Sequence, residues 1–585
     1  MLGAQGTDNR LLQSPWFSSH ARTSSPRIGG ARTERDVPVP PGRRIREHWP
    51  TVWWTESTCT GHAGRCALSL TPVPMNWKRL LPAAPVAGVA ALAAYDLTQK
   101  PHALLRNFPV VGHLRYLLEE MGPELRQYIV ASNDEERPFS RNQRRWIYAS
   151  SKLQNNYYGF GTDNNVEYTP GYPIIKHRTF AAVTEAAARS SSAIPAAKIL
   201  GGPRRRAKAF RPQSVVNVSA MSFGSMSAKA IEAINKGAAL AGSMHNTGEG
   251  GLSPYHRNGG DLILQIGTSY FGCRDEQGRF DIDRLEAVVQ SAPVKAIEIK
   301  LSQGAKPGLG GMLPGAKVTA EIAQIRGIPQ GVDCKSPSRH SEFHDVDSML
   351  DWVEFIADRT GLPVGIKSAV GNMEFWDDLV ANMISGQRGV DFITVDGGEG
   401  GTGAAPLIFS ESVAYPFRIG FAEVYKRFAE AGISDLVTFI GSGKLGLPDN
   451  AIVAFALGAD MVNVGREIML SIGCIQSQKC HTDSCPTGVA TQNAWLARGL
   501  DPTLKSERAA NYIKTLRRDL LKVSEACGVE HPGLITTDDL DILEGVGSKS
   551  SLREVYDYEK GWGVPSMADQ VAITALMATH GHEPA

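Results

Sequence analysis

The chain has 585 residues, of which 42% are hydrophobic and 21% charged, so it can bury more than one core and has the composition of a soluble globular protein. Its 61 Lys and Arg residues balance 60 Asp and Glu residues, and the resulting net charge of +1 excludes the strong overall field that would favour nucleic acid as a partner. Eight cysteines in this length do not form the disulfide framework of a small secreted domain, so we expect a reducing, cytoplasmic environment.

The N-terminal region differs in composition from the rest. Residues 1–74 are rich in Arg, Ser, Pro and Gly and have neither helical nor strand periodicity, which predicts a disordered leader. Met75 is therefore a second candidate for the native start beside Met1. Residues 75–97 are predicted to form an apolar helix after the basic pair Lys78 and Arg79. The apolar run has 16 residues, whereas a spanning helix needs about 20, so a membrane anchor through residues 78–96 is an alternative to a surface or buried helix.

The remaining chain divides into three predicted parts. Residues 98–205 have apolar positions at helical spacing and are expected to form a helical lead-in. Residues 206–535 carry short apolar runs separated by helical segments, and residues 536–585 are expected to form a helical tail. The strand candidates are Val215–Ala220, Gly242–Asn246, Leu262–Ile266, Ala296–Leu301, Gly331–Lys335, Val364–Ser368, Phe392–Val395, Val437–Ile440 and Met461–Val464. Eight or nine such units predict an α/β fold of the (β/α)₈ TIM barrel type.

The carboxyl end of nearly every predicted strand is rich in glycine or basic residues. These ends carry Met221-Ser222, Glu249, Lys300 with Gln303 and Lys306, Lys367, Asp396-Gly397-Gly398, Gly441-Ser-Gly443-Lys and Gly465-Arg466. In a TIM barrel the active site lies at this face, and turns after the last two strands bind phosphate. A flavin would need that phosphate grip and a cation near its ring, for which Lys300 and Lys367 are candidates. The alternative is that the glycines only make tight turns and the lysines lie in solvent.

Three cysteines lie close together in one loop. Cys474, Cys480 and Cys485 have five and then four residues between them, and the loop is flanked by Gly and Pro. A loop of this length can bring three thiolates to one soft metal centre, which indicates an iron–sulfur cluster of the three-iron type or a four-iron cluster with a distant fourth ligand. A zinc site that includes His481, or three unrelated buried thiols, are the alternatives.

Several motifs together resemble a known family. They are Met221-Ser-Phe-Gly, Ser243-Met-His-Asn-Thr-Gly-Glu-Gly-Gly, Gln303-Gly-Ala-Lys-Pro-Gly, Asp396-Gly-Gly-Glu-Gly-Gly-Thr-Gly and Cys480-His-Thr-Asp-Ser-Cys-Pro-Thr-Gly-Val-Ala-Thr-Gln. In this order, across about residues 140 to 535, they resemble the FMN-binding synthase domain of glutamate synthase. The resemblance implies a (β/α)₈ barrel with FMN and a [3Fe-4S] cluster that aminates 2-oxoglutarate and reduces 2-iminoglutarate to glutamate.

The resemblance also implies roles for individual residues. Cys474, Cys480 and Cys485 would hold the cluster. Glu249 and Lys306 would act in catalysis, while Arg326 and Lys306 would bind 2-oxoglutarate, Arg326 by a bidentate grip on one carboxylate. FMN would contact Met221, Ser222, Lys300, Gln303, Lys367, Asp396, Gly397, Gly398, Gly441, Gly443, Gly465 and Arg466.

Some positions depart from the family pattern. Leu309 and Met312 stand where the large enzymes carry an acidic residue and a glutamine that helps bind the oxo acid, and His245 replaces a small polar residue. We find no glutaminase domain and no dinucleotide fingerprint after a strand. We therefore expect free ammonia or a separate glutaminase as the nitrogen source, and a ferredoxin or a separate NAD(P)H reductase subunit as the electron donor.

Three other functions remain open from the sequence. One is synthesis of an N-alkylglutamate or another amino acid by the same chemistry. Another is a different barrel flavoprotein, for which the cysteine loop would have no reason. The third is an electron-transfer subunit whose flavin and cluster relay electrons to a partner, although a relay would not need Glu249, Lys306 and Arg326.

Overall fold

The computed structural model describes residues 83–122, 135–182 and 193–579. Residues 76–585 form one compact unit. The predicted leader, residues 1–74, lies outside the described residues.

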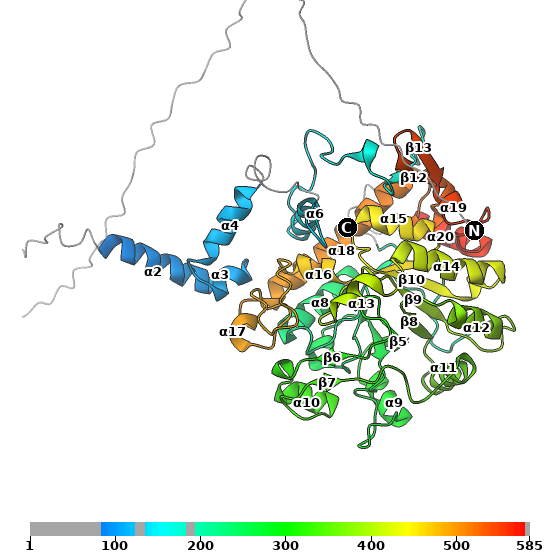
Figure 1. Ribbon diagram of the computed structural model, residues 1–585, viewed down its shortest axis with the longest axis horizontal. Helices are drawn as coiled ribbons and strands as arrows, with labels where there is room; N and C mark the ends of the chain where they lie inside the picture. Colours follow the sequence, from blue (N-terminus) through cyan, green and yellow to red (C-terminus); the bar gives the residue numbers. More distant parts are fainter. Residues whose placement is uncertain (1–82, 123–134, 183–192, 580–585) are drawn as a thin grey trace, which may run out of the picture. The chain divides into compact units, whose positions relative to one another are not determined.

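Eight parallel strands close into a barrel, which confirms the predicted fold (Figure 1). In barrel order from β2 they are β2 (Val216–Val218), β3 (His245–Asn246), β4 (Leu262–Ile266), β5 (Val294–Lys300), β8 (Val364–Ser368), β9 (Phe392–Asp396), β10 (Thr438–Ser442) and β11 (Met461–Val464). The last strand pairs with the first, with Val462 opposite Val216, so the barrel has no free edge. Almost every strand residue is buried, because helices cover the outside and side chains fill the inside.

One strand candidate is not part of the barrel. Of Gly331–Lys335 only Cys334–Lys335 forms a strand, β7, which pairs antiparallel with β6 (Met312–Leu313). The segment has only Val332 and Cys334 as apolar residues, and Val332 is 55% exposed. It therefore lacks the continuous apolar run that a strand covered on both faces requires.

Helices follow the strands and surround the barrel. They are α8 (Ala228–Ala241), α9 (Ile282–Gln290), α10 (Ala320–Arg326), α11 (Val346–Thr360), α12 (Glu374–Met383), α13 (Leu407–Ser412), α14 (Phe417–Glu430), α15 (Pro448–Ala456) and α16 (Arg466–Ser471). Local sequence sets their ends: the Asp345 carboxylate accepts the N–H of Ser348 at the start of α11, and Gly361, with φ of 71°, ends it.

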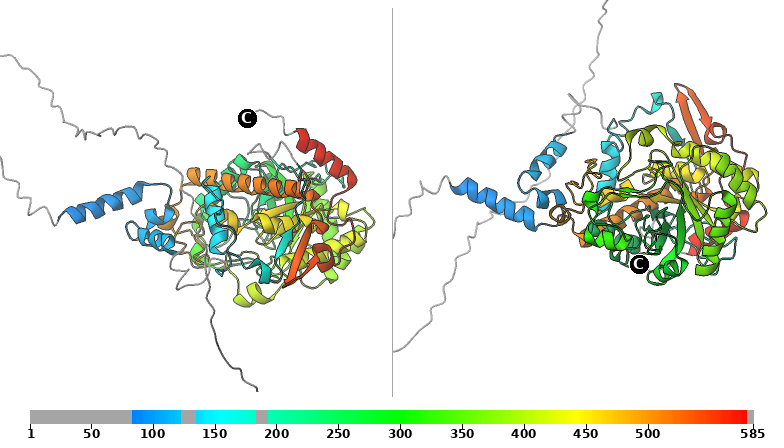
Figure 2. Two further views of the ribbon diagram at one scale, coloured as in Figure 1. Left: turned by 90° about the horizontal axis from the view of Figure 1, so that it is seen from above. Right: turned by 60° about the horizontal axis from the view of Figure 1, so that its bottom comes forward.

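A long C-terminal helix braces one side of the barrel. Helix α18 (Pro502–Ala526) packs along α8 and also contacts α6 (Arg141–Ser151), as Figures 1 and 2 show. The approach of α18 to α8 is close, since a Cβ at Gly237 would lie 2.6 Å from the Cβ of Ala509. Glycine at this position is therefore required by packing.

Helix α2 (Ala83–Thr98) lies almost entirely within the segment predicted as an apolar helix. In the predicted lead-in, residues 98–205, the described α-helices are α3 (Ala103–Asn107), α4 (Gly112–Glu120) and α6, and the one strand among the described residues is β1 (Pro173–Ile175). Most of the described lead-in after α6 is turn or irregular structure. Asn107 fixes α3 to the core by donating from Nδ2 to the carbonyl oxygens of Pro486 and Leu496, at 2.8 and 2.9 Å. Among the described residues no helix has both the length and the apolar character that crossing a bilayer requires.

The C-terminal tail is not helical throughout. Helices α19 (Leu552–Val555) and α20 (Met567–Thr579) match the prediction, but β12 (Leu540–Gly545) and β13 (Ser548–Ser551) form a hairpin before them. Strand β12 also pairs antiparallel with β1 from the lead-in. Leu540 and Ile542 are buried, so a strand forms at the start of the expected helical tail because its apolar residues cover the core. The short helix α17 (Ala494–Ala497) lies just before α18.

Candidate functional site

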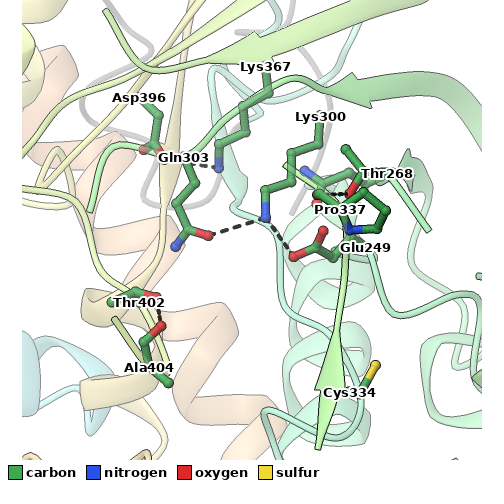
Figure 3. A network of polar contacts seen from close by, with 12 residues as sticks. Glu249, Thr268, Lys300, Gln303, Cys334, Pro337, Lys367, Asp396, Thr402 and Ala404 are labelled. Carbon is green, nitrogen blue, oxygen red and sulfur yellow. Dashed lines mark hydrogen bonds and ion pairs between the residues drawn. The ribbon is translucent and has the colours of Figure 1, made fainter. Parts of the chain in front are cut away.

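Two lysines predicted to face the site lie side by side at the carboxyl ends of β5 and β8. Lys300 and Lys367 are opposite each other in the sheet register, and both are buried. Lys300 Nζ lies 2.6 Å from Glu249 Oε1 and 3.3 Å from Gln303 Oε1 (Figure 3). The structure thus brings Lys300, Glu249 and Gln303 into one polar cluster, with Glu249 supplied by the glycine-rich turn after β3.

The ionisation of this cluster is set by its cations. Burial alone would raise the pKa of Glu249, but Lys300 beside it, with Lys306 and Arg326 nearby, holds that pKa below its ordinary value. Burial and the charge of Lys300 lower the pKa of Lys306 to about 8. Among the described residues the Lys306 amine has no hydrogen-bond partner. Glu249 is therefore a stable carboxylate, whereas Lys306 can gain or lose a proton near neutral pH.

Arg326 lies behind the turn that carries Glu249. Its Nη2 donates to the carbonyl oxygen of Phe223 at 3.1 Å, and its Nη1 is 3.9 Å from Cys334 Sγ. A Cβ at Gly250 would come within 2.7 Å of Nη2, so glycine is needed there for the guanidinium to fit. Both arms of Arg326 face protein atoms in this arrangement, so it adds positive charge behind Glu249 rather than an open fork for a carboxylate.

A second buried ion pair lies next to the first cluster. Lys367 Nζ is 3.5 Å from Asp396 Oδ2, and Asp396 also accepts from Ser442 Oγ at 2.8 Å and from the N–H of Gly304 at 3.0 Å. Burial alone would lower the pKa of Lys367, but Asp396 and Glu298 hold it above its ordinary value. Lys367 is therefore a permanent cation at the mouth of the barrel (Figure 3).

The turns after β10 and β11, the seventh and eighth barrel strands, offer free backbone donors. Among the described residues no acceptor takes the N–H groups of Gly443, Lys444 or Arg466. The side chains of Lys444 and Arg466 flank the Phe139 ring, each 5.2 Å from its centroid. Free N–H groups beside two cations are the donor set that a phosphate needs.

Other predicted cofactor residues have different roles. The N–H groups of Gly397 and Gly398 donate to the carbonyl oxygens of Ser442 and Tyr415, both at 2.8 Å, so they are not available to a ligand. Gly441 lies within β10, and the N–H of Gly465 contacts Glu467 Oε2 at 3.3 Å.

Met221 and Ser222 follow β2 and lie next to the turns after β3 and β11. Met221 donates its N–H to the carbonyl oxygen of Asn246, and a Cβ at Gly465 would lie 3.8 Å from the Met221 methyl carbon. A Cβ at Gly248 would be 2.8 Å from the Ser222 nitrogen. Glycine at position 248 therefore allows the turn after β3 to pack closely against the turn after β2.

The three cysteines of the predicted cluster are close enough for the charge of one thiolate to affect the pKa of another. Burial raises the pKa of Cys474 to about 12, and the thiols of Cys485 and Cys480 raise it as well. Lys317 donates from Nζ to the carbonyl oxygen of Cys480 at 3.2 Å, which anchors the loop. Within the described part of the chain, however, no three His, Cys, Asp or Glu side chains converge closely enough to hold a metal ion. The iron–sulfur interpretation therefore stays a prediction.

Comparison with known proteins gives the family. Residues 190–530, more than half of the chain, match the family described as a conserved region in glutamate synthase. The chain belongs to the glutamate synthase family.

Three relatives with glutamate synthase names match between 57% and 77% of this chain. The glutamate synthase large subunit-like protein YerD of Bacillus subtilis is 37% identical over 483 residues, which cover 77% of this chain and 91% of YerD. The archaeal-type glutamate synthase (NADPH) of Thermotoga maritima is 35% identical over 338 residues, 57% of this chain and 62% of that protein. The archaeal glutamate synthase (NADPH) of Methanocaldococcus jannaschii is 34% identical over 347 residues, 58% of this chain and 64% of its own.

Two of the three departures from the glutamate synthase pattern, Leu309 and Met312, lie on the segment that runs from Lys306 into β6. Met312 begins β6 and is 37% exposed, and Leu309 is half-buried beside Lys306. His245 is fully buried, and its Nε2 has no partner among the described residues. Burial lowers the pKa of His245 well below its ordinary value, so it is a neutral core residue rather than part of the site.

Two charged residues near these groups were not among the predicted site residues. Glu298 is fully buried inside the barrel and accepts from Asn246 Nδ2, Gln265 Nε2 and Thr394 Oγ1 at 2.6 to 2.7 Å. Lys444 flanks the free N–H groups. A charged residue within an otherwise apolar strand would have pointed to Glu298, and the Gly-Ser-Gly-Lys turn would have pointed to Lys444.

A cavity of about 520 Å³ adjoins the Glu249 cluster. Thr268 and Pro337 line it and are joined by a 2.8 Å hydrogen bond from Thr268 Oγ1 to the Pro337 carbonyl oxygen. Figure 3 shows this pair beside Glu249. His340, also in the cavity wall, has its Nε2 3.0 Å from the carbonyl oxygen of Lys300.

Proposed function

We propose that the protein is a glutamate synthase-type oxidoreductase that converts 2-oxoglutarate and ammonia to glutamate. The observation that carries this proposal is the Glu249 cluster, in which one buried carboxylate is surrounded by Lys300, Lys306 and Arg326. The cations outnumber the carboxylate three to one, so the site carries positive charge that a dicarboxylate would neutralise. An electron relay would have no need of such a site.

The turns after β10 and β11 fit the phosphate of FMN. Gly443, Lys444 and Arg466 would hold the phosphate through free N–H groups and two cations, and Lys367 would supply positive charge near the ring. When bound, FMN would supply the hydride that reduces the imine carbon. The remaining steps depend on the side chains of the chain itself.

Lys306 is the proposed proton-transfer residue. Its pKa of about 8 lets the ammonium form donate a proton to the hydroxyl group that leaves when ammonia has added to the keto carbon. Glu249 has a lowered pKa, which makes it a weak base. We therefore assign Glu249 the task of holding Lys300 and the proton on Lys306, and Arg326 the task of supporting the Glu249 turn with positive charge.

Cys474, Cys480 and Cys485 are the proposed ligands of a [3Fe-4S] cluster. The mutual charge interactions of the three thiols support this set, and the buried position of Cys485 would shield a cluster from solvent. Cys474→Ser should lower the iron content of the purified protein. Cys527→Ser, a buried thiol outside the loop, is the matched control and should retain the iron. Equal iron in both variants would remove the loop from this role.

Nitrogen and electrons are proposed to come from outside the chain. Free ammonia or a separate glutaminase would supply nitrogen, and a ferredoxin or a separate NAD(P)H reductase would supply electrons.

The activity can be tested with ¹⁵N-ammonium and a chemical reductant. Wild-type protein loaded with FMN should incorporate ¹⁵N into glutamate from 2-oxoglutarate, and Lys306→Met should lose most of this activity while it retains FMN. Lys335→Met, which removes an exposed lysine from β7, is the control. Flavin bound at full occupancy without any ¹⁵N product from 2-oxoglutarate would refute the proposed substrate, and product from another oxo acid would identify the alternative.

A further inference from the structure

Helix α2 presents apolar side chains to solvent on nearly all sides. The exposed fractions are 70% for Val86, 53% for Val89 and 64% for Tyr95. From Ala83 to Tyr95 the only polar side-chain atom is the Tyr95 hydroxyl oxygen. A helix that is apolar all round is stable only when protein or lipid covers it. No such cover is present among the described residues.

Helix α4 adds a second exposed apolar face. Val111, Leu114, Leu118 and Met121 recur at spacings of three and four residues, so they share one face, and each is between 48% and 73% exposed. On α4 the apolar residues therefore form a stripe, whereas on α2 they surround the helix.

Asp96 fixes the two helices to each other. This residue of α2 is fully buried, accepts the N–H of Val110 at 2.8 Å, and lies 2.9 Å from His113 Nε2. The buried carboxylate thus holds the start of α4 against the end of α2. We call Val86, Val89, Leu92, Leu114, Leu118 and Met121 the α2–α4 apolar surface.

The surface has features of a membrane-binding segment. A helix that docks on one protein partner needs an apolar stripe on one face only. Helix α2 is apolar on all faces, which a lipid environment would cover more completely. The 16 residues of α2 rise by about 24 Å, less than the roughly 30 Å of a bilayer hydrocarbon core. The sequence before the helix contains Trp77, Lys78 and Arg79. Tryptophan and basic residues next to an apolar segment match the chemistry of anionic lipid headgroups.

We propose that the α2–α4 apolar surface inserts into one leaflet of an anionic lipid bilayer and holds the protein at the membrane without spanning it. Apolar burial supplies the main binding energy, and Lys78 and Arg79 add attraction to anionic headgroups. Helix α3 lies between α2 and α4 in the chain, and its Asn107 donates a hydrogen bond to the carbonyl oxygen of Pro486, which follows Cys485. The cysteine loop is therefore linked directly to the membrane-binding part of the chain.

Vesicle flotation of the full-length chain tests this proposal. Vesicles of phosphatidylcholine with about 30% phosphatidylglycerol provide an anionic surface. The wild type should float with them, and the double variant Val86→Glu/Leu114→Glu should partition about tenfold less or weaker still. The matched control is Ile384→Glu/Val546→Glu, which places the same charges at sites that are 58% and 74% exposed elsewhere on the molecule. The control should float like the wild type.

Three outcomes would overturn the proposal. Wild-type protein that stays in solution, or equal loss of flotation in both double variants, would remove the surface from membrane binding. Light scattering on the same proteins gives the third outcome. A wild-type dimer that becomes a monomer only in Val86→Glu/Leu114→Glu, with no vesicle binding by either, would show that a second copy of the chain covers the surface.

Discussion

Replacement of Glu249 by glutamine gives a sharp test of how the site sets the protonation of Lys306. Burial and Lys300 lower the pKa of Lys306 to about 8, and Glu249 acts in the opposite direction. Glu249→Gln keeps the shape of the side chain and an oxygen for Lys300, but it removes the negative charge. Loss of this neighbouring negative charge should lower the Lys306 pKa, and a shift of about one unit corresponds to about 1.4 kcal/mol.

The pH above which the rate falls should move with the pKa of Lys306. Because Lys306 donates as the ammonium, kcat/KM for 2-oxoglutarate should fall above pH of about 8 in the wild type and above about 7 in Glu249→Gln. The assay adjusts ammonium chloride at each pH so that free ammonia stays constant. Glu399→Gln removes a carboxylate from the turn after β9, at the same barrel face, and should leave the pH at which the rate falls at its wild-type value. A value that stays in place or moves upward in Glu249→Gln would refute the assigned role of Lys306.

Three further variants test other parts of the account. Lys505, whose Nζ donates to the Pro101 carbonyl oxygen, has its pKa lowered to about 7 by burial and by nearby cations, so the unfolded chain binds its proton more tightly than the folded chain between pH of about 7 and 10. Lys505→Met should therefore gain more stability at pH 6.5 than at pH 9, by about 2 to 3 kcal/mol, and equal gains in thermal melts would contradict this. Glu298→Leu leaves three buried donors without their acceptor and should lower stability by about 3 kcal/mol or more in denaturant melts, and unchanged stability would mean that the network relaxes. Lys367→Met should lower the FMN retained per chain on gel filtration, whereas Lys426→Met, which breaks an exposed ion pair with Asp557, should retain it; equal retention would exclude Lys367 from the flavin site.

The barrel was predictable because its strands are apolar on both faces. Runs such as Phe392–Val395 are too short for buried helices and end at glycine, which is typical of parallel strands. The same reasoning was wrong for Gly331–Lys335, which was predicted to be a barrel strand although it has only two apolar residues. Only Cys334–Lys335 forms a strand, and it lies outside the barrel. The same reasoning also missed the β12–β13 hairpin, because β13 (Ser548–Ser551) is polar throughout and has no buried residue. The other neighbour of β12 is β1, which lies more than 360 residues earlier in the chain.

The site was predictable only as far as strand ends define it. The positions of Lys300, Lys367 and Glu249 follow from the rule that strand ends share one face of the barrel. Which groups pair does not follow from that rule. The contact between Arg326 and the Phe223 carbonyl oxygen joins residues 103 positions apart and depends on how α10 packs. The Arg326 guanidinium was expected to face a substrate carboxylate, but its Nη2 donates to the Phe223 carbonyl oxygen. The spacing of residues in the sequence does not predict this contact.

The most direct test of the proposed activity is anaerobic reoxidation of the reduced protein, followed by flavin absorbance. The protein is loaded with FMN, reduced with dithionite and mixed with 2-oxoglutarate and ammonium, and in a second experiment with 2-oxoglutarate and glutamine. The account predicts rapid reoxidation with ammonium, glutamate as the product, and no faster reoxidation with glutamine than without a nitrogen source. Flavin that stays reduced with 2-oxoglutarate and ammonium would contradict the account.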